Sequence, residues 1–131
     1  MGMVHSLVTK GVKISVESFF QNDYSNAREH KFIFTYKVFI ENNNPYTVQL
    51  LRRHWLIFDS NGTHREVEGE GVIGQQPIID SGDAHTYVSW SQLETEIGYM
   101  HGTYQMQNLE DGSIFDVEIP SFHLIVPGRL N

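Results

Sequence analysis

The sequence contains no cysteine in its 131 residues. This absence excludes disulfide bonds, thiolate metal sites, iron–sulfur clusters and a cysteine nucleophile. Basic residues are also few, since 9 Lys and Arg stand against 16 Asp and Glu and give a net charge of −7. Nonspecific nucleic-acid binding needs a basic face, so the composition argues against a nucleic-acid partner.

Long hydrophobic segments are missing as well. No apolar run approaches the roughly 20 residues that a membrane-spanning helix needs, and residues 1–10 lack the apolar region of a signal peptide. We therefore expect a cytoplasmic protein that does not insert into membranes. The length predicts a single domain over residues 1–131, with loose termini at 1–9 and 128–131.

The apolar residues recur with a period of two, which is the pattern of half-buried β-strands. The alternation is clearest in residues 12–16 and 32–40, and Asn- and Gly-rich turns separate the runs. Further strands are predicted at Tyr46–Phe58, Thr63–Val72, His85–Trp90, Gly98–Gln107, Ser113–Ile119 and Phe122–Val126. Short strands at this spacing are typical of an all-β sandwich or barrel.

Three local signals qualify this pattern. The apolar phase changes after Leu51, which predicts a β-bulge near Arg52–His54. Ser91–Glu94 matches the helix-capping pattern S-x-x-E and predicts a helix of less than two turns before Gly98. The polar residues Gln21–His30 predict a surface loop.

Residues Gly69–Gly74 spell G-x-G-x-x-G, the pattern of dinucleotide-binding loops. That function requires an apolar strand before the motif and a helix after it. Here the preceding residues 64–68 are highly charged, Pro77 follows closely, and Glu68 and Glu70 would repel a phosphate. We therefore favour a structural glycine bend, where the backbone comes close to another element. An anion nest formed by its amides is the alternative.

Glu66, Glu68 and Glu70 alternate, so a strand would place them on one face. Carboxylate oxygens suit a hard cation such as Mg²⁺, but an acidic stripe also discourages edge-to-edge pairing, and we favour this second interpretation. The seven histidines are at least ten residues apart. Any histidine site would therefore have to be assembled through space.

Arg52, Arg53, His54 and Trp55 are clustered at the predicted bulge. Arginine and tryptophan anchor interfaces, and arginine binds carboxylates or phosphates with two parallel hydrogen bonds. The structural alternative makes Trp55 the core tryptophan of a sandwich, with an arginine packed along it. We favour the core role for Trp55 and leave both interpretations open for the two arginines.

Long segments of the sequence resemble the ApaG family from about residue 12 to residue 127. The resemblance is carried by Val48–Trp55, Asp59–Gly62, Glu66–Pro77, Gly98–Met106 and Phe115–Phe122. It implies an immunoglobulin-like or fibronectin type III-like antiparallel β-sandwich of about seven to nine strands. It also implies a standalone bacterial protein, and it links the chain to cobalt tolerance and magnesium efflux. Related domains occur in eukaryotic F-box proteins, where a substrate-binding role is assumed.

From these features we expect a non-enzymatic binding module with an unidentified protein partner and no cofactor. No catalytic residue or metal ligand is assigned. Two alternatives are pyrophosphate or nucleotide binding at the glycine bend, and a divalent-metal-responsive protein. The sequence does not determine the oligomeric state. The candidate binding surface consists of Arg52, Arg53, His54, Gly69, Gly71, Gly74, Gln75 and Gln76.

Overall fold

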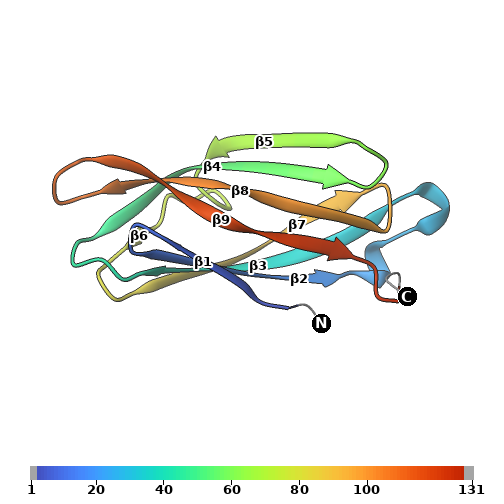
Figure 1. Cartoon of the computed structure of the whole chain (residues 1–131), viewed down its shortest axis with the longest axis horizontal. Coiled ribbons are helices and arrows are strands. Elements are labelled where there is room, and N and C mark those ends of the chain that lie inside the picture. Colours follow the sequence, from blue (N-terminus) through green and yellow to red (C-terminus); the bar gives the residue numbers. More distant parts are fainter. Residues whose placement is uncertain (1–2, 129–131) are drawn as a thin grey trace.

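The computed structural model describes residues 3–128 and forms a sandwich of two antiparallel sheets (Figure 1). The first sheet has the order β1-β2-β3-β7, and the second has the order β5-β4-β8-β9, with β6 also paired to β4. This confirms the predicted all-β antiparallel sandwich. The strands are β1 (His5–Thr9), β2 (Val12–Phe20), β3 (Phe32–Asn42), β4 (Val48–Asp59), β5 (His64–Glu70), β6 (Ile78–Ile79), β7 (Ala84–Leu93), β8 (Ile97–Asn108) and β9 (Ile114–Ile125).

The core lies between the sheets and is built by the inward side chains of each strand. Trp55 is at its centre, with only 2% of its surface exposed. Its ring packs against Tyr36, Phe122 and Tyr104 at centroid distances of 5.3, 6.0 and 6.3 Å, all near edge-to-face. Such pairs add to the free energy that burial itself contributes. The prediction of a core tryptophan is confirmed.

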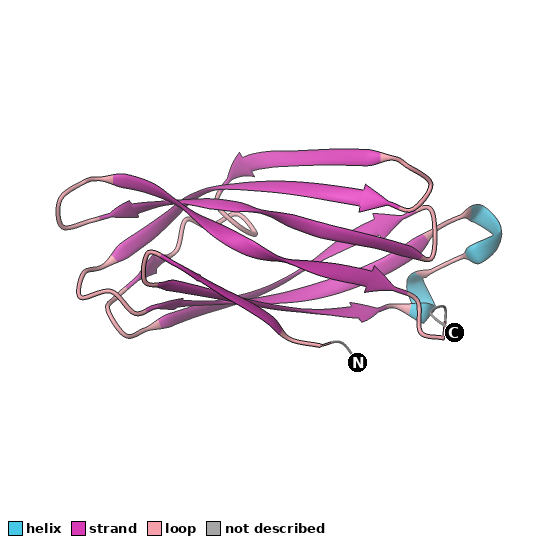
Figure 2. Cartoon of the chain, in the orientation of Figure 1, coloured by secondary structure: helices cyan, strands magenta, loops and turns pink. Residues whose placement is uncertain are grey.

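The structure differs from the sequence predictions in several elements. Ser91–Leu93 belong to strand β7, so the short helix predicted at Ser91–Glu94 is wrong. The two strands predicted at 113–119 and 122–126 form one strand, β9, with a register shift opposite Met100 and Gly102. Residues 5–9 pair with β2 and are not loose, whereas residues 129–131 lie outside the described part. The loop 21–30 holds two short 3₁₀ turns, η1 (Asn22–Tyr24) and η2 (Ala27–Glu29), seen in Figure 2.

The two long sides of the sandwich are unlike each other. On one side β1 and β2 lie against β9, and the backbone N–H of Glu118 donates to the Thr9 hydroxyl at 3.2 Å. On the other side the edge strands are β5 and β7, and a cleft opens between them. The described residues include no helix with the length and apolar character needed to cross a membrane. The cleft between β5 and β7 makes this open side the candidate site of binding.

Candidate functional site

A bulge in β4 decides where the predicted arginine cluster points. The register between β4 and β8 shifts between Leu50 and Arg52, so the extra residue is Leu51, slightly earlier than predicted. After the shift Arg53 faces inward with Trp55, while Arg52 and His54 face outward. The structure thus divides the predicted cluster between the two faces of the second sheet.

Arg53 is joined to the glycine bend. Its Nη1 donates to the carbonyl oxygens of Glu70 at 3.0 Å and Gly71 at 3.1 Å. Gly69 lies directly opposite Arg53 in the strand pairing, and a Cβ there would be 2.8 Å from Arg53 Nη1. Gly69 is therefore a place of close approach, because the guanidinium lies over its backbone. Of the predicted surface, Arg53, Gly69 and Gly71 are the residues brought together.

The rest of the bend closes on itself. Val72 and Gln75 exchange backbone hydrogen bonds of 2.8 and 3.0 Å, and the two residues between them both have positive φ, 48° at Ile73 and 70° at Gly74. This is the geometry of a tight two-residue turn. The Gly71 amide donates to Leu51 O at 2.9 Å. The amides of Gly71 and Val72 within the motif, and that of Gln75 just after it, are therefore already bonded, and a strand rather than a helix follows.

Gln76 fixes the bend to strand β4. Its side-chain amide donates to the Leu51 carbonyl at 3.0 Å, and its own carbonyl accepts from the Gln49 side chain at the same distance. Gly74, Gln75 and Gln76 thus serve the turn and its attachment. They do not line the cleft of the open side.

The cleft between β5 and β7 has a volume of about 580 Å³. Arg53 and Arg65 come from the second sheet, whereas Ser89, Ser91 and Trp90 come from strand β7. The Arg65 Nη2 donates across the cleft to the Gln92 carbonyl and, at 3.4 Å, to the Ser91 hydroxyl. Within residues 3–128, neither cleft arginine forms an ion pair. Two guanidinium charges thus face the cleft without a partner carboxylate.

Asp59 and Glu94 also line the cleft, but Asp59 is engaged elsewhere. It is buried, and its carboxylate accepts from the Glu94 backbone N–H at 2.6 Å and from the Thr95 hydroxyl. The Glu94 carboxylate accepts from the Asn61 side chain at 3.5 Å. Both carboxylates are therefore held by hydrogen bonds at the end of the cleft beside the turn that follows β4.

Three buried tyrosines lie behind Arg53. Burial raises the pKa of Tyr36, while its hydrogen bond with Ser89 and the Arg53 charge partly oppose that effect. Burial also raises the pKa of both Tyr87 and Tyr104, whose hydroxyls hydrogen-bond each other. These groups stay protonated at neutral pH. Tyr36, the one of the three that lines the cleft, therefore adds no negative charge beside Arg53.

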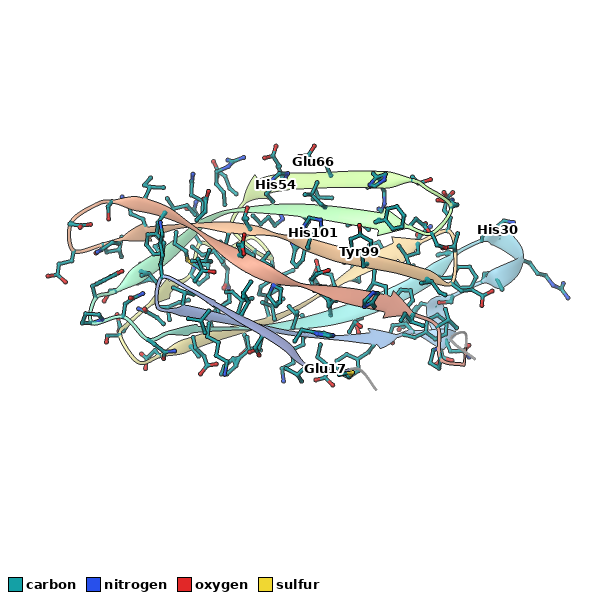
Figure 3. The ribbon with its side chains drawn as sticks, in the orientation of Figure 1. Glu17, His30, His54, Glu66, Tyr99 and His101 are labelled. Carbon is teal, nitrogen blue, oxygen red and sulfur yellow. The ribbon has the colours of Figure 1, made fainter. Side chains whose placement is uncertain are left out.

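Arg52 and His54, the outward-facing residues of the cluster, lie beside the alternating glutamates of β5. Glu68 lies opposite His54 across the strands, and Glu70 lies opposite Arg52. The His54 Nε2 hydrogen-bonds Glu66 and is 3.9 Å from a Glu68 oxygen; Figure 3 shows His54 and Glu66 together on this face. The three possible ligand atoms lie within 4.8 Å of one another. This group is the set of described residues that could hold a cation.

Three further histidines share the outer face with an aromatic pair. Phe58 and Tyr99 stack with a centroid distance of 5.0 Å, and His64, His101 and His123 surround them at 4.8 to 6.4 Å. The histidines separated in the sequence are thus collected by β4, β5, β8 and β9, as Figure 3 shows for His101 and Tyr99. These three imidazoles pack against aromatic rings, and such packing stabilises the fold.

Comparison with known proteins decides the family. The ApaG domain model matches residues 22–108. The chain belongs to the ApaG family. It is 45% identical over 124 residues to the ApaG protein of Brucella canis, with 95% of each chain covered. It is 44% identical to the ApaG protein of Paramagnetospirillum magneticum, with the same coverage.

Solved structures agree with this placement. A crystal structure of an ApaA protein from Bordetella pertussis superposes with a TM-score of 0.86 and 36% identity, covering 89% of this chain and 94% of that one. A second X-ray structure gives a TM-score of 0.85, also at 36% identity, with 90% and 89% covered. The sandwich is thus the ApaG fold, which is fibronectin type III-like. The ApaG relatives named above are bacterial proteins, as the resemblance implied.

Sequence reasoning missed Arg65, Trp90 and the two serines of β7. Arg65 stands in a charged strand and Trp90 alternates with small polar residues, so neither belongs to a motif. They meet only because β5 and β7 are the open edges of two different sheets. The one available signal was a tryptophan at an outward strand position, which leaves it 63% exposed.

Proposed function

We propose that the protein is a non-enzymatic binding module whose open-side cleft receives an anionic group of a protein partner in the cytoplasm. The observation that carries this proposal is the pair of guanidinium groups, Arg53 and Arg65, without an ion-pair partner in residues 3–128. In a chain of net charge −7, such a pair selects for a carboxylate or phosphate, which arginine binds with directed hydrogen bonds.

The surroundings support recognition of a peptide rather than a free ion. Trp90 is exposed at the cleft rim, and exposed aromatics beside arginine are typical of interface anchors. Ser89 and Ser91 offer hydroxyls on the β7 side. The cleft thus offers charged and polar contacts, and Trp90 on the outer face of the same strand offers an apolar contact.

Calorimetric titration with two blocked peptides tests this proposal. The acidic probe is acetyl-TVEVEVT-amide, and the neutral probe, acetyl-TVQVQVT-amide, replaces both glutamates with glutamine. We expect the acidic probe to bind at least about tenfold more tightly, equivalent to about 1.4 kcal/mol. Equal binding of the two probes would contradict the proposal.

Matched variants locate the binding. Arg65→Gln removes an exposed cleft charge, and Arg52→Gln removes the same charge from the opposite face of the second sheet. We expect the first change to weaken the acidic probe about tenfold and the second to leave it unchanged. A loss confined to Arg52→Gln would place the site on the other face.

Binding of pyrophosphate or nucleotide at the glycine bend has less support. The amides of Gly71, Val72 and Gln75 are already bonded, so the bend has few donors left for a phosphate. A divalent-metal response has a specific observation in its favour, namely the convergence of His54, Glu66 and Glu68. One imidazole and two carboxylates suit a transition metal. A rise in melting temperature with Mn²⁺ or Co²⁺, lost in His54→Ala, is the expected result for this second candidate.

A further inference from the structure

Strand β7 is an edge strand without the usual protection. It has ten residues, and its sequence contains no Asp, Glu, Lys, Arg, Pro or Gly. Among residues 3–128 its one partner strand is β3. Exposed edges are normally blunted by charge, proline, bulges or short length, because their free N–H and C=O groups invite another strand. The β3–β7 register runs without a bulge.

The other edges differ in this respect. Strand β5 carries His, Arg and three Glu in seven residues, which opposes pairing. Strand β1 is only five residues long, and a β9 amide on the same side is taken up by Thr9. Strand β7 is therefore the edge best suited to accept an additional strand.

The hydrogen-bond pattern identifies the free groups of β7. The Ile33 carbonyl accepts from Gln21 on the β2 side, whereas the Asn42 amide donates to Asp83 on the β7 side. Even-numbered residues of β3 therefore bond β7 and, by the register, engage its odd-numbered residues. The even-numbered residues of β7 therefore point their backbone N–H and C=O groups away from β3. Gln92 is one of them, and its carbonyl accepts a hydrogen bond from Arg65 on the open side. The free donors and acceptors are those of Thr86, Val88 and Trp90.

Side chains along the same edge alternate between two environments. Val88 and Trp90 lie on the outer face of the first sheet with 55% and 63% of their surface exposed. Ser89 and Ser91 point into the cleft that holds Arg53 and Arg65. A strand paired to β7 would thus place alternate side chains beside an apolar pair and beside two cations.

We propose that β7 binds an extended segment of a partner protein by strand addition, with acidic side chains directed into the cleft and apolar ones beside Val88 and Trp90. This inference rests on the proposed anionic recognition and adds its geometry. Charge complementarity selects this occupant over a second copy of the chain, because another β7 would place Ser89 and Ser91, not carboxylates, near the arginines. Main-chain bonds supply affinity and alternate side chains supply selectivity.

Only alternate residues of an added strand can hydrogen-bond β7, and this gives a direct test. In a strand added antiparallel to β7, a probe residue that bonds β7 lies opposite an outward-pointing residue and shares its outer face. With the glutamates of acetyl-TVEVEVT-amide directed into the cleft, the valines therefore bond β7 and the glutamate N–H groups point away. N-methylation of the three valines removes the bonding donors, whereas N-methylation of the two glutamates should be tolerated better. We expect the valine-methylated peptide to bind at least tenfold more weakly than the glutamate-methylated one.

The outcomes separate the two proposals. If both methylated peptides bind as tightly as the parent, strand addition is overturned while anionic recognition stands. If neither the parent nor any variant peptide binds, both proposals fail. Sedimentation of the protein alone tests whether a second copy of the chain pairs with β7. A dimer that Val88→Lys dissociates would show that a second copy fills this edge and would overturn the inference. A monomer, with the expected order of peptide affinities, supports it.

Discussion

Arg52 and Arg53 are adjacent and identical in type, yet only Arg53 reaches the cleft. The extra residue is Leu51, which precedes both arginines, so the alternation from Arg53 to Trp55 is unbroken and these two side chains share the inner face. The sequence indicated a bulge here from the apolar pattern of β4. Its position depends on pairing with β8, which a single strand's pattern does not contain. Which arginine faces inward could therefore not be predicted.

The hydroxyls of Tyr87 and Tyr104 form a hydrogen-bonded pair inside the core. Tyr104→Phe leaves the Tyr87 hydroxyl buried without that partner, so we expect the free energy of unfolding to fall by about 1–3 kcal/mol. The double variant with Tyr87→Phe should lose less than the sum of the single losses. Denaturant unfolding of the four proteins measures this, and strictly additive losses would contradict a coupled pair.

At the scale of elements, alternation and turn residues predicted most strands but failed where two runs join. Pro120 separates the two predicted strands, yet a register shift against β8 lets β9 continue through it. The capping pattern at Ser91 failed because pairing with β3 outweighs local helix propensity. Both errors arise because pairing with another strand overrides the local sequence signal.

The tight turn at residues 73–74 offers a test of an element's strain. Ile73 is β-branched but has φ of 48°, a region that favours Asn or Gly. Ile73→Asn should raise the free energy of unfolding by about 1 kcal/mol. The matched control is Ile78→Asn, since both isoleucines are 61% exposed and Ile78 lacks a positive φ. Equal stability changes in the two variants would argue against strain at the turn.

At the scale of the whole molecule, the sequence predicted the sandwich but not its open side. Edge strands β5 and β7 belong to different sheets, and which edges face each other depends on the order of strands in both sheets. Arg53 and Gly69 were identified from local motifs, whereas Arg65 and Trp90 required the assembled sheets.

The buried tyrosines predict how overall stability depends on pH. Burial raises the pKa of Tyr36, Tyr87 and Tyr104 in the folded state, while in the unfolded chain each stays near 10. Above about pH 10 the unfolded chain therefore binds fewer protons than the native one, and the free energy of unfolding falls as pH rises. Below that pH these groups contribute no slope.

Denaturant midpoints between pH 8 and pH 11 measure this dependence. The Tyr87→Phe/Tyr104→Phe protein should lose stability less steeply above pH 10, because two of the three raised groups are gone. An unchanged slope in that variant would assign alkaline unfolding to other groups.

Nuclear magnetic resonance locates the peptide on the protein surface. Chemical shifts of the ¹⁵N-labelled protein, followed during titration with the acidic probe, report each backbone amide and the Trp90 indole. We expect the largest changes on residues 86–92, including the Trp90 indole, and around Arg53 and Arg65, on the open side of the sandwich. Changes confined to β4 and β5 around the outer-face group His54, Glu66 and Glu68, with none on residues 86–92, or no changes at all, would contradict it.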